Sequence, residues 1–336
     1  MVTIDDIKQA QSLIRPFIKQ TPVVSSSLLN SWLGHEIFFK AECLQTTGAF
    51  KLRGACHFLA QLKKQKQLPK RIVANSSGNH AQAVAYAGRL FKVPVEIFSA
   101  ANISPIKAAA TQYYGAKLST FETRVMADEA VQRASQEQDT VWIPPFNHPY
   151  IIAGQGTAAL EALKQCEDID MLATPCGGGG LLSGSIVAAR ASKRDLRVIG
   201  AEPLAANDAA QSLRQGSIVS LKSTPTTLAD GAATPSIGEH TFEIIKQVNA
   251  FYEVNETDIA YWTQWLQHLL KLHIEPTCAM TMQAVVNELA ASKNRGQPEK
   301  QRVMVIISGG NISQQSMHTI WQSDHLSTVP SLELAK

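Results

Sequence analysis

From about residue 70 onward, short apolar runs of the chain alternate with stretches of helical character. RIVANSS at 71–77 leads into NHAQAVAYAGRLF, and VPVEIFSA at 93–100 precedes PIKAAATQYYGA. Further on, MLATP is followed by LLSGSIVAARASK, and LRVIGAEP is followed by NDAAQSLRQG. A strand followed by a helix, repeated in this way, is typical of parallel sheets covered by helices. The sequence therefore predicts an α/β fold with mostly parallel sheets flanked by helices.

The size and charge of the chain limit the kinds of protein that it can be. Its 336 residues exceed the usual size of one domain, which favours two lobes of roughly 100 to 200 residues each. Lys and Arg number 31 against 28 Asp and Glu, with no long basic run, so a nucleic-acid partner is not expected. The start of the chain carries Asp5 and Asp6 and no apolar run, so neither a secretion signal nor a membrane span is expected. These features predict a cytoplasmic enzyme.

Lys51 lies in an unusual setting, the stretch TTGAFKLRGA at 46–55. Two glycines, small residues and an aromatic side chain surround it, whereas a surface lysine usually lies among other polar residues. An amine must be uncharged to act as a nucleophile, and the free lysine pKa of about 10.4 means that burial or a neighbouring charge has to favour the neutral form. The setting suggests a lysine used for chemistry.

A run of four glycines, Gly177, Gly178, Gly179 and Gly180, stands between a short apolar run and a predicted helix. Glycine lets the backbone expose successive N–H groups to an anion, and the helix start adds unpaired donors and partial positive charge. The spacing does not fit the G-x-G-x-x-G dinucleotide fingerprint, because Leu182 or Ser183 stands where the third glycine would be. It does not fit a P-loop either, because no Gly-Lys-Ser/Thr follows. We therefore expect a phosphate-binding loop of another kind.

Two further loops share the same design. Ser76, Ser77, Gly78, Asn79 and His80 follow the strand-like VAN and precede a predicted helix, so their hydroxyl, amide and backbone N–H groups could form a carboxylate receptor. In VIISGGN, Ser308 ends an apolar run and two glycines follow. Ligands gather at the carboxyl ends of parallel strands, so these loops and Lys51 are expected to converge there.

The chain resembles a known family in a series of ordered motifs. These are TGAFKLRGA, SSGNHAQAVAYA, IAGQGTAALE, CGGGGLLSG, GAEP, TLADG, IEPT and ISGGN. They occur in the order seen in the serine/threonine dehydratases and serine racemases, which are pyridoxal-phosphate enzymes of fold type II. The resemblance covers about residues 10–320 and implies a two-lobed enzyme. The implied parts are a discontinuous large domain at 1–69 and 148–325, a small domain at 70–147 and a C-terminal tail at 326–336.

The resemblance implies pyridoxal 5'-phosphate as the cofactor and assigns residues to it by position. Lys51 is similar to the lysine that binds the cofactor covalently, and Phe50 to the residue that packs near its ring. Asn79 resembles the partner of the cofactor's phenolic oxygen, and Ser308 the partner of its pyridine nitrogen. The glycines at 177–180 resemble its phosphate loop.

The SSGNH loop is similar to the family's site for the substrate carboxylate, which implies substrate binding by Ser76, Ser77, Asn79 and His80. Ser77 also occupies the position that serves as acid or base, on the cofactor face opposite the lysine, in serine racemases. A serine stands there in dehydratases as well, so carboxylate binding and helix capping remain equal alternatives for Ser77.

A metal site is also implied by the resemblance, in the stretch GAEPLAAND. Glu202, the carbonyl of Ala206 and Asp208 match the spacing of the divalent-ion site in racemase-like members. Oxygen ligands of this kind suit Mg²⁺ or Ca²⁺. A simpler alternative is that the two carboxylates are favoured by the partial positive charge at a helix start.

The activity implied is β-elimination from a hydroxy amino acid such as L-threonine or L-serine, giving a 2-oxo acid and ammonia. Serine racemase and threo-3-hydroxyaspartate dehydratase are alternatives within the family, and a homodimer is expected. A β-replacing synthase of the cysteine synthase kind is disfavoured, because its loops favour Thr-Ser-Gly-Asn-Thr and Gly-Thr-Gly-Gly-Thr where this chain has NSSGNHA and CGGGG. A noncatalytic binding protein on the same scaffold is disfavoured by the presence of Lys51.

The chain departs from the family's pattern in two places. Asn147 and His148 stand where many dehydratases carry acidic residues, and Cys278 stands where a small residue is more usual. All three are expected near the substrate, and Phe146 is expected to wall the side-chain pocket. The preference among serine, threonine and 3-hydroxyaspartate therefore stays open.

Overall fold

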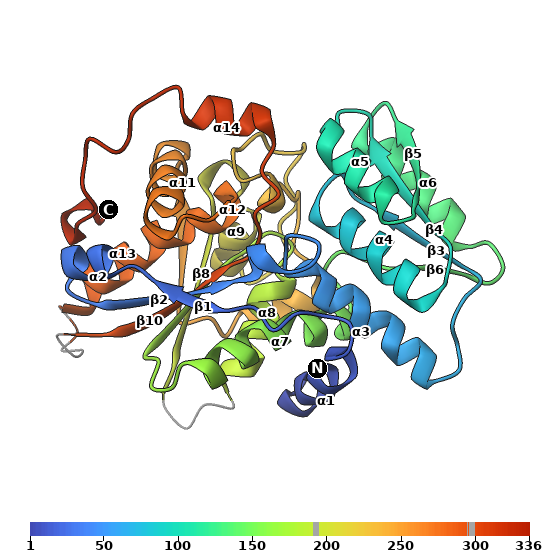
Figure 1. Cartoon of the computed structure of the whole chain (residues 1–336), viewed down its shortest axis with the longest axis horizontal. Coiled ribbons are helices and arrows are strands. Elements are labelled where there is room, and N and C mark those ends of the chain that lie inside the picture. Colours follow the sequence, from blue (N-terminus) through green and yellow to red (C-terminus); the bar gives the residue numbers. More distant parts are fainter. Residues whose placement is uncertain (191–194, 294, 296–299) are drawn as a thin grey trace.

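The computed structural model describes residues 1–190, 195–293, 295 and 300–336, and these residues form two β-sheets with helices around them (Figure 1). Parallel pairing dominates both sheets, so the predicted α/β fold is confirmed. No helix in this described part of the chain is both long and apolar enough to cross a bilayer.

The larger sheet has six strands, of which only the first is antiparallel to its neighbour. In spatial order they are β1 (Val23–Ser25), β2 (Glu36–Ala41), β10 (Arg302–Ile307), β7 (Met171–Pro175), β8 (Arg197–Pro203) and β9 (Ala250–Val254). Strand β10 is an unbroken apolar run after Arg302 because both faces of the sheet are covered. In β7, Leu172 packs into the core on one face, and Met171 and Ala173 pack into the core on the other.

The smaller sheet has four parallel strands. In spatial order they are β5 (Lys117–Phe121), β4 (Val95–Ala100), β3 (Arg71–Asn75) and β6 (Thr140–Trp142). Its helices are α4 (Asn79–Phe91), α5 (Pro105–Tyr113) and α6 (Arg124–Ser135). All of these elements lie between residues 71 and 142, and the domain boundaries at 70 and 147 stay our proposal.

The remaining helices pack on the larger sheet or on the helices that cover it. The α-helices are α1 (Ile4–Ile14), α2 (Ser27–Leu33), α3 (Lys51–Lys64), α7 (Pro149–Gln165), α8 (Gly180–Ala189), α9 (Asp208–Gln215), α10 (Glu239–Ile245), α11 (Glu256–Leu270), α12 (Pro276–Ala279), α13 (Thr281–Lys293) and α14 (Gln314–Ile320). Short 3₁₀ turns are η1 (Glu42–Leu44), η2 (Leu204–Ala206), η3 (Asp230–Ala232) and η4 (Leu332–Leu334).

Helices α7 and α8 approach each other closely where two glycines meet. A Cβ on Gly184 would lie 2.6 Å from Gly156 Cα, so only glycine allows this distance between the backbones. The close contact fixes α8 against α7, which lies beside α3 (Figure 1). The first turn of α8 carries the end of the glycine run.

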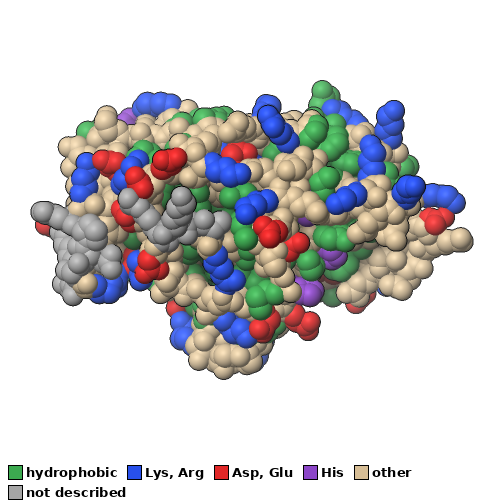
Figure 2. Space-filling view, turned by 90° about the horizontal axis from the view of Figure 1, so that it is seen from below, with side chains coloured by type: hydrophobic (Ala, Val, Ile, Leu, Met, Phe, Trp, Pro, Cys, Tyr) green, Lys and Arg blue, Asp and Glu red, His purple; other side chains and the backbone are tan. Residues whose placement is uncertain are grey.

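The C-terminal residues 326–336 pack on the larger lobe. Leu332 and Leu334 contact the core beside α11 and α13, and Gln283 Nε2 donates to the Leu334 carbonyl at 2.9 Å. On the face drawn in Figure 2, basic and acidic side chains are interspersed among the described residues, in keeping with a net charge of +3.

Candidate active site

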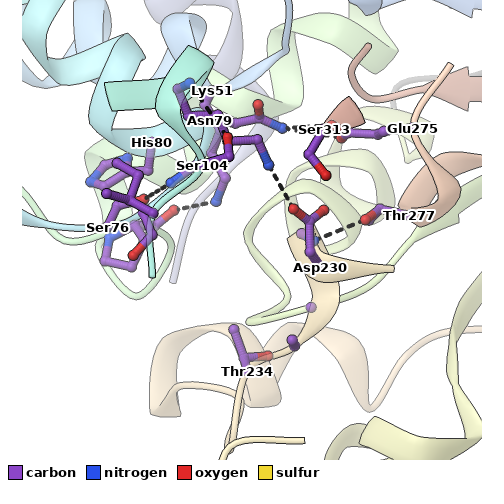
Figure 3. Close-up of a pocket in the computed structure, with 18 of the residues that line it drawn as sticks. Lys51, Ser76, Asn79, His80, Ser104, Asp230, Thr234, Glu275, Thr277 and Ser313 are labelled. Atoms are coloured by element: carbon purple, nitrogen blue, oxygen red, sulfur yellow. Dashed lines mark hydrogen bonds and ion pairs between the residues drawn. The ribbon is translucent and has the colours of Figure 1, made fainter. Parts of the chain in front are cut away.

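A cavity of about 1010 Å³ lies at the carboxyl ends of strands from both sheets (Figure 3). Its lining comes from the loops that follow β3, β4, β6, β7 and β10, together with the start of α3. The residues predicted for cofactor and substrate all line it: Phe50, Lys51, Ser76, Ser77, Asn79, His80, Gly177, Gly178, Gly179, Gly180 and Ser308. The structure therefore brings together the loops that the sequence placed at strand ends.

Lys51 is the first residue of α3, and its amine is directed into the cavity (Figure 3). Lys51 Nζ donates to the carbonyl of Pro145 at 2.7 Å and lies 5.2 Å from the centre of the Phe50 ring. Burial lowers the pKa of Lys51 to about 8, although the negative charge of Glu275 acts in the opposite direction. A substantial fraction of this amine is therefore neutral near pH 8, as nucleophilic chemistry requires.

The segment that carries Lys51 is held by the loop after β10. Phe50 N donates to the Ser308 carbonyl at 2.9 Å, and Gly310 N donates to the Gly48 carbonyl at 2.9 Å. Gly48 has a φ of 72°, a conformation that favours glycine. These contacts fix the lysine relative to Ser308.

The glycine run forms a bare cradle between β7 and α8. Gly179 has a φ of 87°, and its own Cβ would lie 2.4 Å from Ile245. A Cβ on Gly178 would lie 2.1 Å from the Phe146 ring. No side chain can therefore be added here without displacing a neighbour. The backbone N–H groups at the start of α8 are left for an anion.

Residues 76–78 join β3 to α4, and Asn79 and His80 form the first turn of that helix. Ser76 Oγ accepts from Gly78 N at 3.1 Å, and the hydroxyls of Ser77 and Ser99 are 2.9 Å apart. These contacts place both predicted serines on the cavity wall.

His80 lies at the inner end of this loop and is 3% exposed. Burial, together with the charge of Lys51, lowers the pKa of His80 to about 3, so its ring is neutral. His80 Nε2 lies 2.9 Å from the Ile143 carbonyl, which can only accept, so Nε2 carries the proton and Nδ1 is an acceptor. This arrangement does not favour the predicted contact between His80 and a carboxylate.

Ser308 stands at the end of β10 with its hydroxyl buried. Its side chain is 1% exposed, and Ser308 Oγ has no hydrogen-bond partner of good geometry in the described part of the chain. A buried hydroxyl without a partner costs free energy unless a ligand supplies one. A ligand atom that accepts or donates a hydrogen bond is therefore expected beside it.

Four polar residues at or beside the cavity were not predicted from the sequence as site residues: Lys107, Asp230, Glu275 and Asn311. Glu275 is 2% exposed and accepts from Asn79 Nδ2 at 3.1 and 3.0 Å. Burial raises the pKa of Glu275 to about 7, and Asp230 adds to the rise. Lys107 Nζ of α5 lies 2.6 Å from Asp230 Oδ2 of η3, so this ion pair joins the smaller lobe to the larger one beside the cavity (Figure 3). IEPT and TLADG carried the only sequence signal for Glu275 and Asp230.

Three of the departures from the family pattern lie behind the cavity wall. Asn147 Oδ1 accepts from His240 N at 2.9 Å, and His148 Nδ1 accepts from Tyr150 N at 3.1 Å as the N-cap of α7. Cys278 Sγ is fully buried, 3.1 Å from the Glu275 carbonyl. These side chains cap helices or pack and do not line the cavity, so the expectation that they lie near the substrate stays a prediction. Phe146 does line the cavity.

The residues predicted for a metal lie together near the end of β8. Glu202 and Asp208 are each 1% exposed, and Ala206 ends the η2 turn between them. Glu202 accepts from the backbone N–H groups of Ala209 and Ala210 at 3.2 and 2.7 Å, whereas Asp208 has no hydrogen-bond partner of good geometry for its carboxylate within the described residues.

Burial strongly affects both of these carboxyl groups. It raises the pKa of Glu202 to about 9 and that of Asp208 to about 7. A cation would stabilise their ionised forms. The described residues contain no cluster of three or more His, Cys, Asp or Glu side chains that could hold a metal, so carbonyl oxygens and water would complete the coordination.

Comparison with known proteins shows the family. Residues 14–309 match the family described as pyridoxal-phosphate dependent enzyme. An L-threo-3-hydroxyaspartate ammonia-lyase of Saccharomyces cerevisiae is 38% identical over 323 residues, which is 95% of this chain and 96% of the relative. This chain is a pyridoxal-phosphate dependent enzyme.

Other relatives of the enzyme point to the same branch of the family. A serine racemase of Schizosaccharomyces pombe is 38% identical over 312 residues, which is 92% of this enzyme and 94% of the relative. Among solved structures, a serine racemase from Dictyostelium discoideum is 36% identical with a TM-score of 0.84, covering 93% of this enzyme and 99% of that chain. A solved threonine deaminase has the same identity, TM-score and coverage. The resemblance to serine/threonine dehydratases and serine racemases, and the fold type II architecture, are confirmed.

The cavity of the enzyme fits pyridoxal phosphate. The amine of Lys51 lies where it could bind the aldehyde carbon, and the cradle at 177–180, where side chains would clash with neighbouring residues, offers backbone N–H groups for the phosphate. Ser308 Oγ, buried and without a hydrogen-bond partner of good geometry among the described residues, would contact the ring nitrogen. A hydroxyl there cannot fully protonate the ring as a carboxylate would, which makes a weaker electron sink.

Proposed function

We propose that this enzyme catalyses β-elimination from a hydroxy amino acid such as L-serine or L-threonine, giving a 2-oxo acid and ammonia. The observation that carries the proposal is the partly buried Lys51 amine, which shares a cavity with the glycine cradle and the Ser76–Ser77 loop. Relatives named as an ammonia-lyase and a serine racemase support this reaction class.

The protein's own groups have separate tasks in this reaction. The Ser76–Ser77 loop and the start of α4 would hold the substrate carboxylate through hydroxyl and backbone N–H groups. Lys51 Nζ would remove the α-proton as general base. Pyridoxal phosphate, when bound, supplies the electron sink for the charge left on the α-carbon. The β-hydroxyl takes up a proton, in net terms the one that Lys51 removed from the α-carbon, and leaves as water. Water then hydrolyses the released enamine to the 2-oxo acid and ammonia.

Two other activities of the same site differ only in the fate of the α-proton or in the substrate. If Ser77 Oγ returns a proton to the other side of the α-carbon, the enzyme racemises serine. If the cavity accepts a substrate with a second carboxylate, the enzyme eliminates water from threo-3-hydroxyaspartate. A β-replacing synthase is a weaker candidate, because the loops at 75–81 and 176–180 differ from those of that group. We also propose a cytoplasmic homodimer.

Incubation of the purified enzyme with L-serine, D-serine, L-threonine and threo-3-hydroxyaspartate tests the proposal. We expect 2-oxo acid and ammonia in equal amounts from at least one L-hydroxy amino acid, with the enantiomers of the remaining substrate measured in the same sample. In the Ser77→Ala variant, any racemisation should fall far more than elimination, by about 10²-fold or more, because a general acid or base contributes at least that much. Racemisation with no 2-oxo acid from any substrate would contradict elimination.

The metal site makes a separate prediction. Because Glu202 and Asp208 are buried with raised pKa values, an Mg²⁺ ion between them should stabilise the fold. A free Mg²⁺ concentration a hundred times the dissociation constant is expected to stabilise the enzyme by about 2.7 kcal/mol, measured as a rise in melting temperature relative to a chelator-treated sample.

The Asp208→Asn variant should lose this response to Mg²⁺, whereas Asp5→Asn, an exposed control on α1, should keep it. Melting temperatures that are the same with Mg²⁺ and with chelator would contradict the site. Glu202 would then be interpreted as a partner of the backbone N–H groups at the start of α9.

A further inference from the structure

A chain of side-chain hydrogen bonds runs through Asn79 at the cavity wall. Asn79 Nδ2 lies 3.1 and 3.0 Å from the two carboxylate oxygens of Glu275. Asn79 Oδ1 accepts from Asn311 Nδ2 at 2.8 Å, and the same Asn311 nitrogen donates to the Thr47 carbonyl, also at 2.8 Å. The loops before α3, after β3, before α12 and after β10 therefore meet in one chain.

Both ends of this chain consist of groups that only accept. The backbone carbonyl of Thr47 carries no proton at any pH, and the carboxylate of Glu275 carries none in its ionised form, above its raised pKa of about 7. The Thr47 carbonyl alone already sets the direction of the chain. Asn311 must therefore turn its NH₂ group toward both Thr47 and Asn79. Asn79 must then present its oxygen to Asn311 and its NH₂ group to Glu275. The orientation of an amide is assigned from such a network, and here only one orientation satisfies every member.

We propose that Asn311 and Glu275 are positioning residues that hold the Asn79 amide with its NH₂ group available to the cofactor. An NH₂ group has two hydrogens, and Glu275 engages one side of it, which leaves the other for the phenolic oxygen of pyridoxal phosphate. A reversed amide would instead place two acceptors against each other. The inference rests on the proposed role of Asn79 as partner of that oxygen.

Two glycines make room for the positioning residues. A Cβ on Gly48 would lie 2.4 Å from Asn311 Oδ1, and a Cβ on Gly309 would lie 2.5 Å from Glu275 Oε1. These glycines belong to the segments TGAF and SGGN, so the backbone on either side of the amide chain approaches it directly. This packing leaves the Asn311 amide and the Glu275 carboxylate little freedom to take other positions.

The Asn311→Asp variant tests the proposal, because aspartate has nearly the same shape but only accepts. The new carboxylate would face the Asn79 oxygen and the Thr47 carbonyl, so the Asn79 amide is expected to turn over. We expect the dissociation constant of pyridoxal phosphate to rise about tenfold or more, since the loss of one hydrogen bond to a charged group is worth that factor. The absorption spectrum of the bound cofactor should change as well.

Asn287→Asp is the matched control on α13. Asn287 Oδ1 accepts from Gln283 Nε2 and from Lys336 N, and aspartate keeps that acceptor and adds the same charge. Its cofactor affinity and absorption spectrum should equal those of the unchanged enzyme. A matching change in this control would overturn the proposal, because a general effect of added charge would explain the result.

A double variant, Asn311→Asp with Glu275→Gln, separates positioning from stability. In it, the amide introduced by Glu275→Gln can donate to a reversed Asn79, so the melting temperature should recover toward that of the unchanged enzyme. The spectrum should stay altered, because Asn79 still presents its oxygen to the cofactor. Recovery of the spectrum together with the stability would overturn the proposal, as would a normal spectrum and affinity in Asn311→Asp alone.

The Asn79→Ala variant distinguishes two possible errors: that Asn311 does not position Asn79, and that Asn79 does not contact the cofactor. If Asn79→Ala changes the spectrum and Asn311→Asp does not, Asn79 contacts the cofactor but the positioning by Asn311 is refuted. If neither substitution changes it, the role of Asn79 is refuted and the inference falls with it. Neither result affects the proposed elimination, which is measured independently as 2-oxo acid.

Discussion

The Lys51→Ala variant is expected to lose turnover by at least about 10⁴-fold, because the substitution removes two contributions to catalysis at once. The amine is the group placed to bind the cofactor covalently, and it is also the proposed base for the α-proton. The other lysine on the described cavity wall, Lys107, is held by Asp230 at 2.6 Å and cannot take its place. Release of 2-oxo acid from the best substrate measures the loss.

A second readout for the same variant does not depend on turnover. Borohydride reduction should fix the cofactor to the unchanged enzyme, with the matching increase in intact mass, and should leave Lys51→Ala unlabelled. Lys63→Ala is the control, since Lys63 lies on the same helix but is exposed. It should be labelled and fully active. Full turnover by Lys51→Ala, with a normal circular dichroism spectrum, would refute the proposed function.

The loops that form the site could be predicted because their signal is local. Four consecutive glycines, the SSGNH loop and Ser308 each follow an apolar strand, and in a parallel sheet the ends of such strands meet at one edge. The structure confirms that they share one cavity with Lys51. The composition and the alternation of strands and helices were likewise enough to predict the α/β fold class.

The parts that sequence analysis missed depend on partners far away in the chain. Glu275 is 196 residues from Asn79, and Asn311 is 264 residues from Thr47. The residues next to Glu275 in IEPT and to Asn311 in SGGN do not indicate which distant side chains these two residues will bond to. Asn147, His148 and Cys278 were expected near the substrate, and none of the three lines the cavity. Sequence position near a cavity does not tell which way a side chain points.

The largest feature without a sequence signal is a buried group of charges behind Lys51. Arg53, two residues along α3, donates to Glu42 at 2.7 Å through both Nε and Nη2, and to Glu161 at 3.0 Å. Lys40 Nζ lies 2.5 Å from Glu161. The side chains of Lys40, Glu42 and Arg53 are fully buried, and two basic groups balance two acidic ones.

The Arg53→Met variant is expected to reduce the free energy of unfolding by about 3–5 kcal/mol. Methionine fills much of the same volume, but two carboxylates then remain with only one cation, so one buried negative charge is left uncompensated. The hydrogen bond from Arg53 to Thr157 at 3.3 Å is lost as well. Denaturant unfolding followed by circular dichroism measures the difference. Because Arg53 belongs to the first turn of α3, cofactor binding at Lys51 should weaken in parallel.

Arg133→Met is the matched control for this experiment. Arg133 pairs with Glu129 at 3.9 Å on the surface of α6, where both side chains are mostly exposed. An exposed pair of this kind contributes less than about 1 kcal/mol, so the same chemical change should have little effect there. If the two variants lost the same free energy of unfolding, the buried charges would contribute no more to the stability of α3 than an exposed ion pair does. A large loss for Arg53→Met alone, together with weaker cofactor binding, would indicate that residues of η1 and α7, outside the cavity, help to hold Lys51 in place.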